Sequence, residues 1–270
     1  MTGSQKGFVA EQITVLYDAK SSRVSLRSTP VLHRVLPLMG RSESRLSRQQ
    51  MSKELIEFWS QAAPDYDRVV ELQIGPGTRE QVRERLAQED ALGRAVEFGC
   101  GTGFFTEALA SKASSVLATD AAPGMLAFAR ERLGDKTIEF QVADCQGSSI
   151  PAAAFDTALL SLVLQFVDHE RTIAEMHRVL KPGGLLLIAN LDVLALSVTQ
   201  RMRCLWRVVY EGRRGYANRQ PRRFGRNVIG GDQLRNLLDK RGFDVLHCET
   251  IVNASRASYI PVNYVRACRR

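Results

Sequence analysis

Residues 95–103 read Ala-Val-Glu-Phe-Gly-Cys-Gly-Thr-Gly, a short apolar run that breaks into three glycines at alternate positions. A helix-like segment, residues 104–112, follows at once. A strand, a glycine turn and a helix in this order let the backbone come close to a nucleotide-like ligand, because glycine accepts positive φ and has no Cβ. A tight turn between two core elements would explain the same residues equally well. The neighbouring sequence is needed to distinguish the two interpretations.

Strands and helices alternate regularly after this turn. Apolar runs predict strands at 95–98, 115–119, 138–142, 155–164 and 185–189, and periodic segments predict helices at 104–112, 123–133 and 169–180. This alternation is typical of βαβ units, so we expect a largely parallel sheet with helices on both faces. Two further apolar runs, 243–251 and 259–267, are suited to pair antiparallel.

The segment before the first strand has helical signals. Leu55, Phe58, Trp59 and Ala62 recur at spacings of three and four, which predicts an amphipathic helix from Met51. A second helix is predicted at 78–88, where Thr78 and Gln81 have the spacing of a capping box.

Charge and cysteine usage limit the class of protein. The net charge is +8, but residues 1–50 hold eight Lys and Arg against three acids, and residues 201–226 hold nine Arg against Glu211 alone. The remainder is therefore net acidic, and the positive charge lies in two patches. The five cysteines include no Cys-x-x-Cys pair, which favours reduced thiols in the cytoplasm over a disulfide framework or a zinc site. No apolar run approaches the roughly 18 residues that span a bilayer.

Acidic residues stand at fixed places on this frame. Glu97 lies two residues before the first glycine, Asp120 ends the second strand and Asp144 follows the third. Ligands of an open parallel sheet bind beyond the carboxyl ends of its strands, so we expect these groups to meet around one ligand. An acid at the end of the second strand is suited to accept both hydroxyls of a ribose.

Five ordered motifs give the chain a family resemblance. They are residues 97–103 (Glu-Phe-Gly-Cys-Gly-Thr-Gly), 119–126, 143–145, 155–164 and 178–184 (Arg-Val-Leu-Lys-Pro-Gly-Gly), with an entry segment at 58–67. The sequence resembles the class I S-adenosylmethionine-dependent methyltransferases, close to the small-molecule branch that includes ubiquinone/menaquinone-biosynthesis-like enzymes. The resemblance implies an α/β, Rossmann-like fold: a mainly parallel seven-stranded sheet, an antiparallel last strand and helices on both faces.

The resemblance also implies S-adenosylmethionine as cofactor and assigns residues to it. Gly99, Gly101 and Gly103, with Cys100 between them and Glu97 supporting them, would face its methionine part. Asp120 would hold the ribose hydroxyls, while the adenine would lie near Ala121, Met125, Asp144 and Cys145. Ser161 and, more weakly, Tyr66 would lie at the methionine end.

The acceptor is less well defined by the sequence. A general base is optional in methyl transfer, and His169 is the histidine best placed for that role. The family's variable substrate lid corresponds to residues 191–227, where Trp206, Tyr210, Arg213 and Arg214 would bind an anionic or aromatic small molecule. RNA or an anionic membrane surface suits such a patch too, but residues 51–270 carry a net charge of only about +3.

The predicted organisation is a flexible Ser/Arg-rich extension followed by one methyltransferase domain; a targeting segment and an upstream start are the alternative interpretations of the extension. The parts are 1–50 for the extension, then 51–93 (helical entry), 94–190 (cofactor core), 191–227 (lid) and 228–270 (last helix and strand pair). Two alternatives remain at this point: an NAD(P)-dependent oxidoreductase on the same sheet, and a non-catalytic binding protein. The sequence leaves open which atom is methylated, O, N, S or C, and which oligomeric state the protein has.

Overall fold

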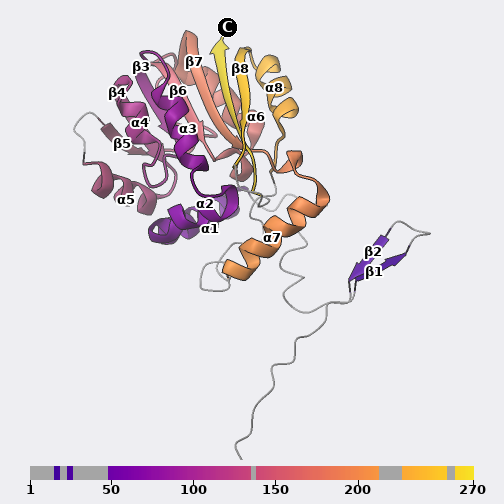
Figure 1. Ribbon diagram of the computed structural model, residues 1–270. Coiled ribbons are helices and arrows are strands. Elements are labelled where there is room, and N and C mark those ends of the chain that lie inside the picture. The colour runs from indigo at the N-terminus through magenta and orange to yellow at the C-terminus, as the bar shows by residue number, and fades with distance from the viewer. Residues whose placement is uncertain (1–14, 19–22, 27–47, 135–137, 213–226, 254–258) are drawn as a thin grey trace, which may run out of the picture. The chain divides into compact units, whose positions relative to one another are not determined.

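The computed structural model describes residues 15–18, 23–26, 48–134, 138–212, 227–253 and 259–270 (Figure 1). It forms two compact units, Met1–Ser42 and Glu43–Arg270, and each is described by itself. In the first unit, β1 (Val15–Asp18) pairs antiparallel with β2 (Arg23–Leu26). Both strands lie within the predicted extension, residues 1–50. The rest of the predicted extension up to residue 47 lies outside the described residues.

The second unit contains all the predicted strands and helices of the central domain. Its elements are α1 (Arg48–Ala62), η3 (Ala63–Asp65), α2 (Tyr66–Ile74), α3 (Thr78–Ala87), β3 (Gly93–Phe98), α4 (Thr106–Ala110), β4 (Ala113–Asp120), α5 (Pro123–Leu133), β5 (Ile138–Val142), β6 (Phe155–Ser161), η4 (Leu164–Phe166), α6 (His169–Val179), β7 (Leu180–Leu191), η5 (Val193–Ala195), α7 (Val198–Gly212), α8 (Gly231–Lys240), β8 (Phe243–Ile251) and β9 (Val262–Arg269). Among the described residues, no helix combines the length and the apolarity that crossing a bilayer requires.

The seven strands form one sheet in the order β5-β4-β3-β6-β7-β9-β8. All neighbours from β5 to β7 are parallel, and β9 is antiparallel to both β7 and β8. The predicted fold is therefore confirmed, including the antiparallel last strand. The carboxyl ends of β3, β4, β5 and β6 lie at one edge of the sheet, where the glycine turn and the two strand-end aspartates come next in the chain.

Consecutive strand residues divide between two hydrophobic cores. Ala95, Leu159 and Leu187 face the helices α3, α4 and α5, whereas the next residue of each strand faces α6 and α8. Figure 1 shows these two groups of helices on opposite sides of the sheet. Because both faces are covered, the central strands β6 and β7 contain continuous apolar runs at 158–160 and 185–189, which explains why they stand out in the sequence.

Two predicted strand limits differ from the structure. β6 ends at Ser161 and not at 164, because Leu162 adopts a left-handed backbone with φ of 56° that cannot continue a strand. β7 starts at Leu180, five residues before the predicted strand. The Lys181–Gly184 segment, which the sequence suggests as a turn before the strand, belongs to the strand itself.

The predicted capping box of α3 is wrong. Gly77, in a left-handed conformation with φ of 78°, takes the N-cap position, and its residue type offers no capping side chain. The Thr78 hydroxyl instead donates to the carbonyl oxygen of Ile74 at 2.7 Å. The short α2–α3 connection therefore uses the hydroxyl to terminate the preceding helix.

The helix α1 crosses α5 at a glycine. A Cβ built on Gly124 would lie 2.3 Å from the backbone oxygen of Ser60, and the Gly124 amide donates to the Ser60 hydroxyl at 3.3 Å. The entry helix thus reaches the cofactor half of the sheet through a contact that only glycine permits.

We predict that Gly124→Ala destabilises the protein by about 1–3 kcal/mol, because a backbone oxygen has no flexible end that can move away. This cost exceeds the helix-propensity gain, at most about 1 kcal/mol. Urea unfolding measures the change. Ala127→Ser, at an exposed position of the same helix, is the control; equal midpoints for wild type and Gly124→Ala would contradict the contact.

Candidate cofactor-binding site

All three glycines of the loop after β3 have positive φ, at 71° for Gly99, 54° for Gly101 and 79° for Gly103. Two of them are required by packing within the protein. A Cβ on Gly99 would lie 2.3 Å from Val163 Cγ2, and one on Gly103 would lie 2.8 Å from Leu133 Cδ1. The loop therefore lies directly against the segment after β6 and against α5.

The middle glycine faces the aromatic ring of Tyr66. A Cβ on Gly101 would lie 3.4 Å from Tyr66 Cε1, and the Tyr66 ring packs edge-on against Trp59 with centroids 5.5 Å apart. Burial raises the pKa of Tyr66 to about 12, although the Arg79 guanidinium opposes this shift. The Tyr66 hydroxyl is therefore a neutral hydrogen-bond donor at pH 7.

The Asp120 carboxylate fixes the glycine loop to the end of β4. Oδ2 accepts from the Gly101 amide at 2.9 Å, and Oδ1 accepts from the Ala122 amide at 2.8 Å. Burial raises the pKa of Asp120, while these backbone donors oppose the shift. Each oxygen keeps a further lone pair, and the side chain is only half-buried, so the residue suits the diol of a ribose.

The predicted adenine side of the site lies next to Asp120. Ala121 is half-buried, and Met125 is buried in a small cluster with Ala122, Trp59 and Tyr66. The structure therefore brings Tyr66, the glycine loop, Asp120 and Met125 together, as the sequence predicts.

Glu97 lies under the loop and is completely buried. Its carboxylate accepts from the Thr106 hydroxyl at 2.6 Å and from the Ser161 hydroxyl at 3.3 Å. Burial raises the pKa of Glu97 to about 7; the two hydroxyl donors oppose this shift, and the charge of Asp120 adds to it. Glu97 thus joins β3, α4 and the end of β6, and the Ser161 side chain is used in this contact.

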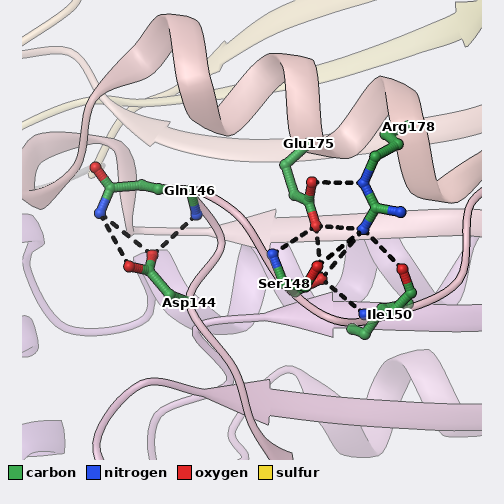
Figure 2. A network of polar contacts seen from close by, with 6 residues as sticks. All are labelled: Asp144, Gln146, Ser148, Ile150, Glu175 and Arg178. Carbon is green, nitrogen blue, oxygen red and sulfur yellow. Dashed lines mark hydrogen bonds and ion pairs between the residues drawn. The ribbon is translucent and has the colours of Figure 1, made fainter.

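Asp144 begins the loop after β5 and is exposed. Its Oδ1 accepts from the backbone amide of Gln146 at 2.9 Å and from the Gln146 side chain at 3.2 Å (Figure 2). The neighbouring Cys145 thiol is buried 3.9 Å from the Thr172 hydroxyl, and burial raises its pKa to about 12. Burial likewise raises the pKa of Cys100, so both cysteines are neutral thiols at pH 7.

The same loop is attached to α6 through Glu175 and Arg178, which form an ion pair on that helix and hydrogen-bond to the loop (Figure 2). Arg178 donates to both carboxylate oxygens of Glu175, at 2.8 and 2.7 Å, and to the carbonyl oxygen of Ile150 at 2.7 Å. Glu175 also accepts from the Ser148 amide at 2.9 Å. This arrangement fixes the loop that carries Asp144. The sequence indicates Arg178 only as part of a motif and gives no sign of this role.

His169, the predicted base, begins α6. Its Nε2 lies 3.0 Å from the carbonyl oxygen of Leu164 and 3.2 Å from that of Asn227. Carbonyl oxygens only accept hydrogen bonds, so Nε2 carries a proton. A base role would fall to Nδ1, and the observed contacts make His169 a link between η4 and the segment before α8.

Part of the predicted acceptor site lies outside the described residues. Trp206 is on α7 with 63% of its surface exposed. Tyr210 belongs to the same helix, but its side chain is outside the described part, as are Arg213 and Arg214.

Asp67 is a site residue that sequence reasoning did not assign. Its Oδ1 accepts from the Thr102 hydroxyl of the glycine loop at 2.7 Å and lies 2.9 Å from Arg79 Nη1; its Oδ2 accepts from Arg132 at 2.8 Å. Arg79 is almost completely buried, with its guanidinium 3.7 Å from the centroid of Phe104. The only signal in the sequence is that Asp67 follows Tyr66 in the entry segment.

Gln165, just after β6, was also missed. Its Nε2 donates to the carbonyl oxygen of the left-handed Leu162 at 2.6 Å, which stabilises that unusual conformation. Within the described residues, nothing donates to its buried Oε1. Neither the strained turn nor this acceptor has a signature in the sequence.

We predict that Glu97 makes the protein less stable as pH rises. The folded state holds the Glu97 proton up to about pH 7, against an ordinary pKa of 4.5, so it binds more protons than the unfolded state between these values. The free energy of unfolding should therefore fall by about 3 kcal/mol from pH 4.5 to 7 through this group. Urea unfolding of wild type and Glu97→Gln across this range should show a smaller fall for the variant; parallel curves would contradict the assignment.

We predict that Asp67→Ala destabilises the protein by about 1–3 kcal/mol, because it removes the counter-ion of the buried Arg79 guanidinium, while the partial exposure of Asp67 limits the cost. Urea unfolding measures this. The matched control is Glu107→Ala, whose carboxylate pairs with Arg83 at 3.5 Å on the surface and should matter by less than about 1 kcal/mol. Similar effects of the two variants would exclude a special role for Asp67.

Comparison with known proteins agrees with this geometry. A family model described as a methyltransferase domain matches residues 96–188. The malonyl-[acyl-carrier protein] O-methyltransferase of Serratia marcescens is 34% identical over 134 residues, which cover 49% of this chain and 51% of that protein. The demethylmenaquinone methyltransferase of Deinococcus radiodurans is 33% identical over 153 residues, covering 52% and 61%. The chain thus spans about half the length of these curated relatives.

A solved structure supports the fold. The S-adenosylmethionine-dependent methyltransferase from Mesorhizobium loti superposes with a TM-score of 0.54 at 24% identity, covering 71% of this chain and 98% of that one. The matched segment 96–188 runs from β3 to β7 and so includes the glycine loop, Asp120 and Asp144. Residues 96–188 of this chain therefore match a methyltransferase domain, and the chain has the fold of the S-adenosylmethionine-dependent methyltransferase from Mesorhizobium loti.

Proposed function

We propose that the chain transfers the methyl group of S-adenosylmethionine to a small-molecule acceptor at O, N, S or C, with S-adenosylhomocysteine as the second product. The observation that carries the proposal is the Asp120 carboxylate, which ends β4 and accepts from the amide of Gly101 in the glycine loop. An acid suited to bind a diol lies next to a glycine loop, and both lie in the segment that matches the methyltransferase family model. Together they favour this function over a nicotinamide-dependent oxidoreductase or a non-catalytic binding protein.

We assign the cofactor contacts on the same basis. Asp120 would accept from the ribose hydroxyls, and Ala121 and Met125 would pack beside the adenine. Asp144 and the Cys145 amide would bind the adenine edge. The glycine loop from Gly99 to Gly103, including Cys100 and supported by Glu97, would lie along the methionine part, with the Ser161 backbone and the Tyr66 hydroxyl at its end.

The cofactor supplies an electrophilic methyl group on a sulfonium, and the protein contributes alignment. The Tyr66 ring lies over Gly101 and Trp59 packs against that ring, so these aromatic side chains would shield this end of the site from water. The neutral thiols of Cys100 and Cys145 are poor nucleophiles, so they would not compete for the methyl group. An acceptor that arrives deprotonated needs no base, and His169 would then act by positioning η4.

For the methyl acceptor we propose only a chemical class, whereas the cofactor contacts are assigned residue by residue. The named relatives act on two different acceptors, malonyl-[acyl-carrier protein] and demethylmenaquinone, so similarity alone does not select one. We propose an anionic or aromatic small molecule, with Tyr210, Arg213 and Arg214 of the lid segment as contacts, and no nucleic acid. Trp206, in the same segment, has 63% of its surface exposed and lies on the outward face of α7. The five free cysteines, of which three are buried, favour the cytoplasm as its place of work.

We predict that S-adenosylmethionine and S-adenosylhomocysteine each raise the melting temperature of the wild type, whereas NAD and NADP do not. A ligand at 100 times its Kd stabilises by about 2.7 kcal/mol, so a bound cofactor gives a shift of several degrees. Asp120→Ala should abolish the shift, because it removes the acceptor for the ribose hydroxyls. A thermal-shift titration measures both effects.

Asp156→Ala is the matched control. Asp156 is also a strand carboxylate that accepts from a backbone amide, that of Arg94 at 2.9 Å, but at the opposite end of the sheet. The control should keep the full shift. A shift with a dinucleotide would overturn the proposal in favour of an oxidoreductase, and equal shifts for Asp120→Ala and wild type would remove Asp120 from the site.

A further inference from the structure

A row of apolar side chains faces solvent along α7 and the turn before it. Leu194, Val198, Met202 and Trp206 follow one another at intervals of four residues, with exposed fractions of 39%, 65%, 48% and 63%. We call these four residues the outer stripe. They are four of the seven large hydrophobic side chains that are exposed among the described residues, so the exposure is concentrated on one helix.

The outer stripe does not result from an undocked helix. Cys204, on the other side of α7, is buried, and α7 packs beside α2 (Figure 1). Arg201 fixes the start of the helix by donating to the carbonyl oxygens of Leu196 at 2.9 Å and Leu194 at 3.0 Å. The helix therefore has an inner face that is already covered and a second apolar face directed outward. A clustered outward apolar face marks an interaction surface.

Charge indicates what the outer stripe contacts. In the sequence, residues 201–226 contain nine Arg and one acid, and among the described residues Arg203, next to Met202, is exposed. The partner must therefore be negatively charged at its surface and apolar just beneath it. An anionic lipid bilayer has this layering, and a basic amphipathic helix with Trp, Met and Val on its apolar face lies in the headgroup region.

Two other negatively charged partners, RNA and an acidic protein, fit the outer stripe less well than a membrane does. RNA binding to such a surface relies on stacking of several bases on aromatic rings, and Trp206 is the only aromatic side chain of this face that the structure describes. An acidic protein would need a pocket or groove to take its anchoring side chain, whereas the stripe is a ridge on a helix. We propose that the outer stripe of α7 docks this protein on an anionic membrane surface, with α7 lying in the plane of the interface.

The proposal has a consequence for the acceptor. α7 follows the carboxyl end of β7, at the sheet edge where the carboxyl ends of β3 and β4 also lie. A docked α7 would therefore hold the acceptor side of the site close to the bilayer. This step rests on the proposed methyl transfer and indicates a lipophilic acceptor; the docking itself does not rest on it.

Vesicle flotation of the full chain tests the docking. We expect binding to vesicles of 70% phosphatidylcholine and 30% phosphatidylglycerol at least about tenfold stronger than to pure phosphatidylcholine. The double variant Val198→Ser/Met202→Ser should weaken binding to the anionic vesicles at least about tenfold. The matched control is Leu246→Ser/Val252→Ser, which removes two side chains that are each 58% exposed but lie at β8. It should bind as the wild type does.

A spectroscopic readout reports on the stripe itself. The chain has two tryptophans, so Trp59→Phe leaves Trp206 as the only indole. Its emission should shift to the blue when anionic vesicles are added, and Val198→Ser/Met202→Ser in this background should suppress the shift.

Several outcomes would overturn the proposal. They are equal binding to both vesicle types, equal loss in the stripe variant and the control variant, or stripe-dependent binding to RNA or to an acidic protein without binding to vesicles. The melting temperatures of the variants without vesicles verify that they fold. Vesicle binding needs neither cofactor nor acceptor, so absence of a thermal shift with S-adenosylmethionine would defeat the proposed function and leave the docking intact.

Discussion

The amide of Gly101 and the carboxylate of Asp120 form the hydrogen bond on which the site depends. It joins the loop after β3 to the end of β4, which are adjacent in the sheet but 19 residues apart in sequence. Through it, a loop made of left-handed glycines has one defined position. The parallel register of β3 and β4 supplies the alignment, so the same burial that stabilises the sheet also prepares the ligand-binding edge.

A buried acid and a half-buried acid support this loop. Glu97 lies beneath it and joins β3 to α4 and β6, whereas Asp67 reaches it from the entry helices. Their electrostatic environments differ. Glu97 has only hydroxyl donors and an elevated pKa, while burial would raise the pKa of Asp67 but Arg79, Thr102 and Arg132 lower it overall. The loop therefore rests on one acid that is easily protonated and one that stays charged.

The features that the sequence predicted are those encoded by neighbouring residues. Strands buried on both faces are continuous apolar runs, and the glycine loop, Asp120 and Asp144 follow them directly, so the sheet and the strand-end acids were predictable. Residues determined by distant contacts were not. The end of β6 depends on a left-handed Leu162 held by Gln165, and Asp67 acts through Thr102 and Arg132, 35 and 65 residues away. The sequence analysis noted that residues 191–227 suit an anionic surface, but only the structure shows which side of α7 is covered and which is exposed.

The position of Asp67 also decides what counts as a functional unit of this chain. The segment that matches the methyltransferase domain begins at residue 96 and contains Thr102 and Arg132, but not Asp67 or Arg79. A fragment cut at that boundary would keep the whole glycine motif and lose the carboxylate that fixes its threonine. The segment matched by the family model is thus shorter than a piece that contains both partners of these ion pairs, and the entry helices belong to the site as much as the motif does.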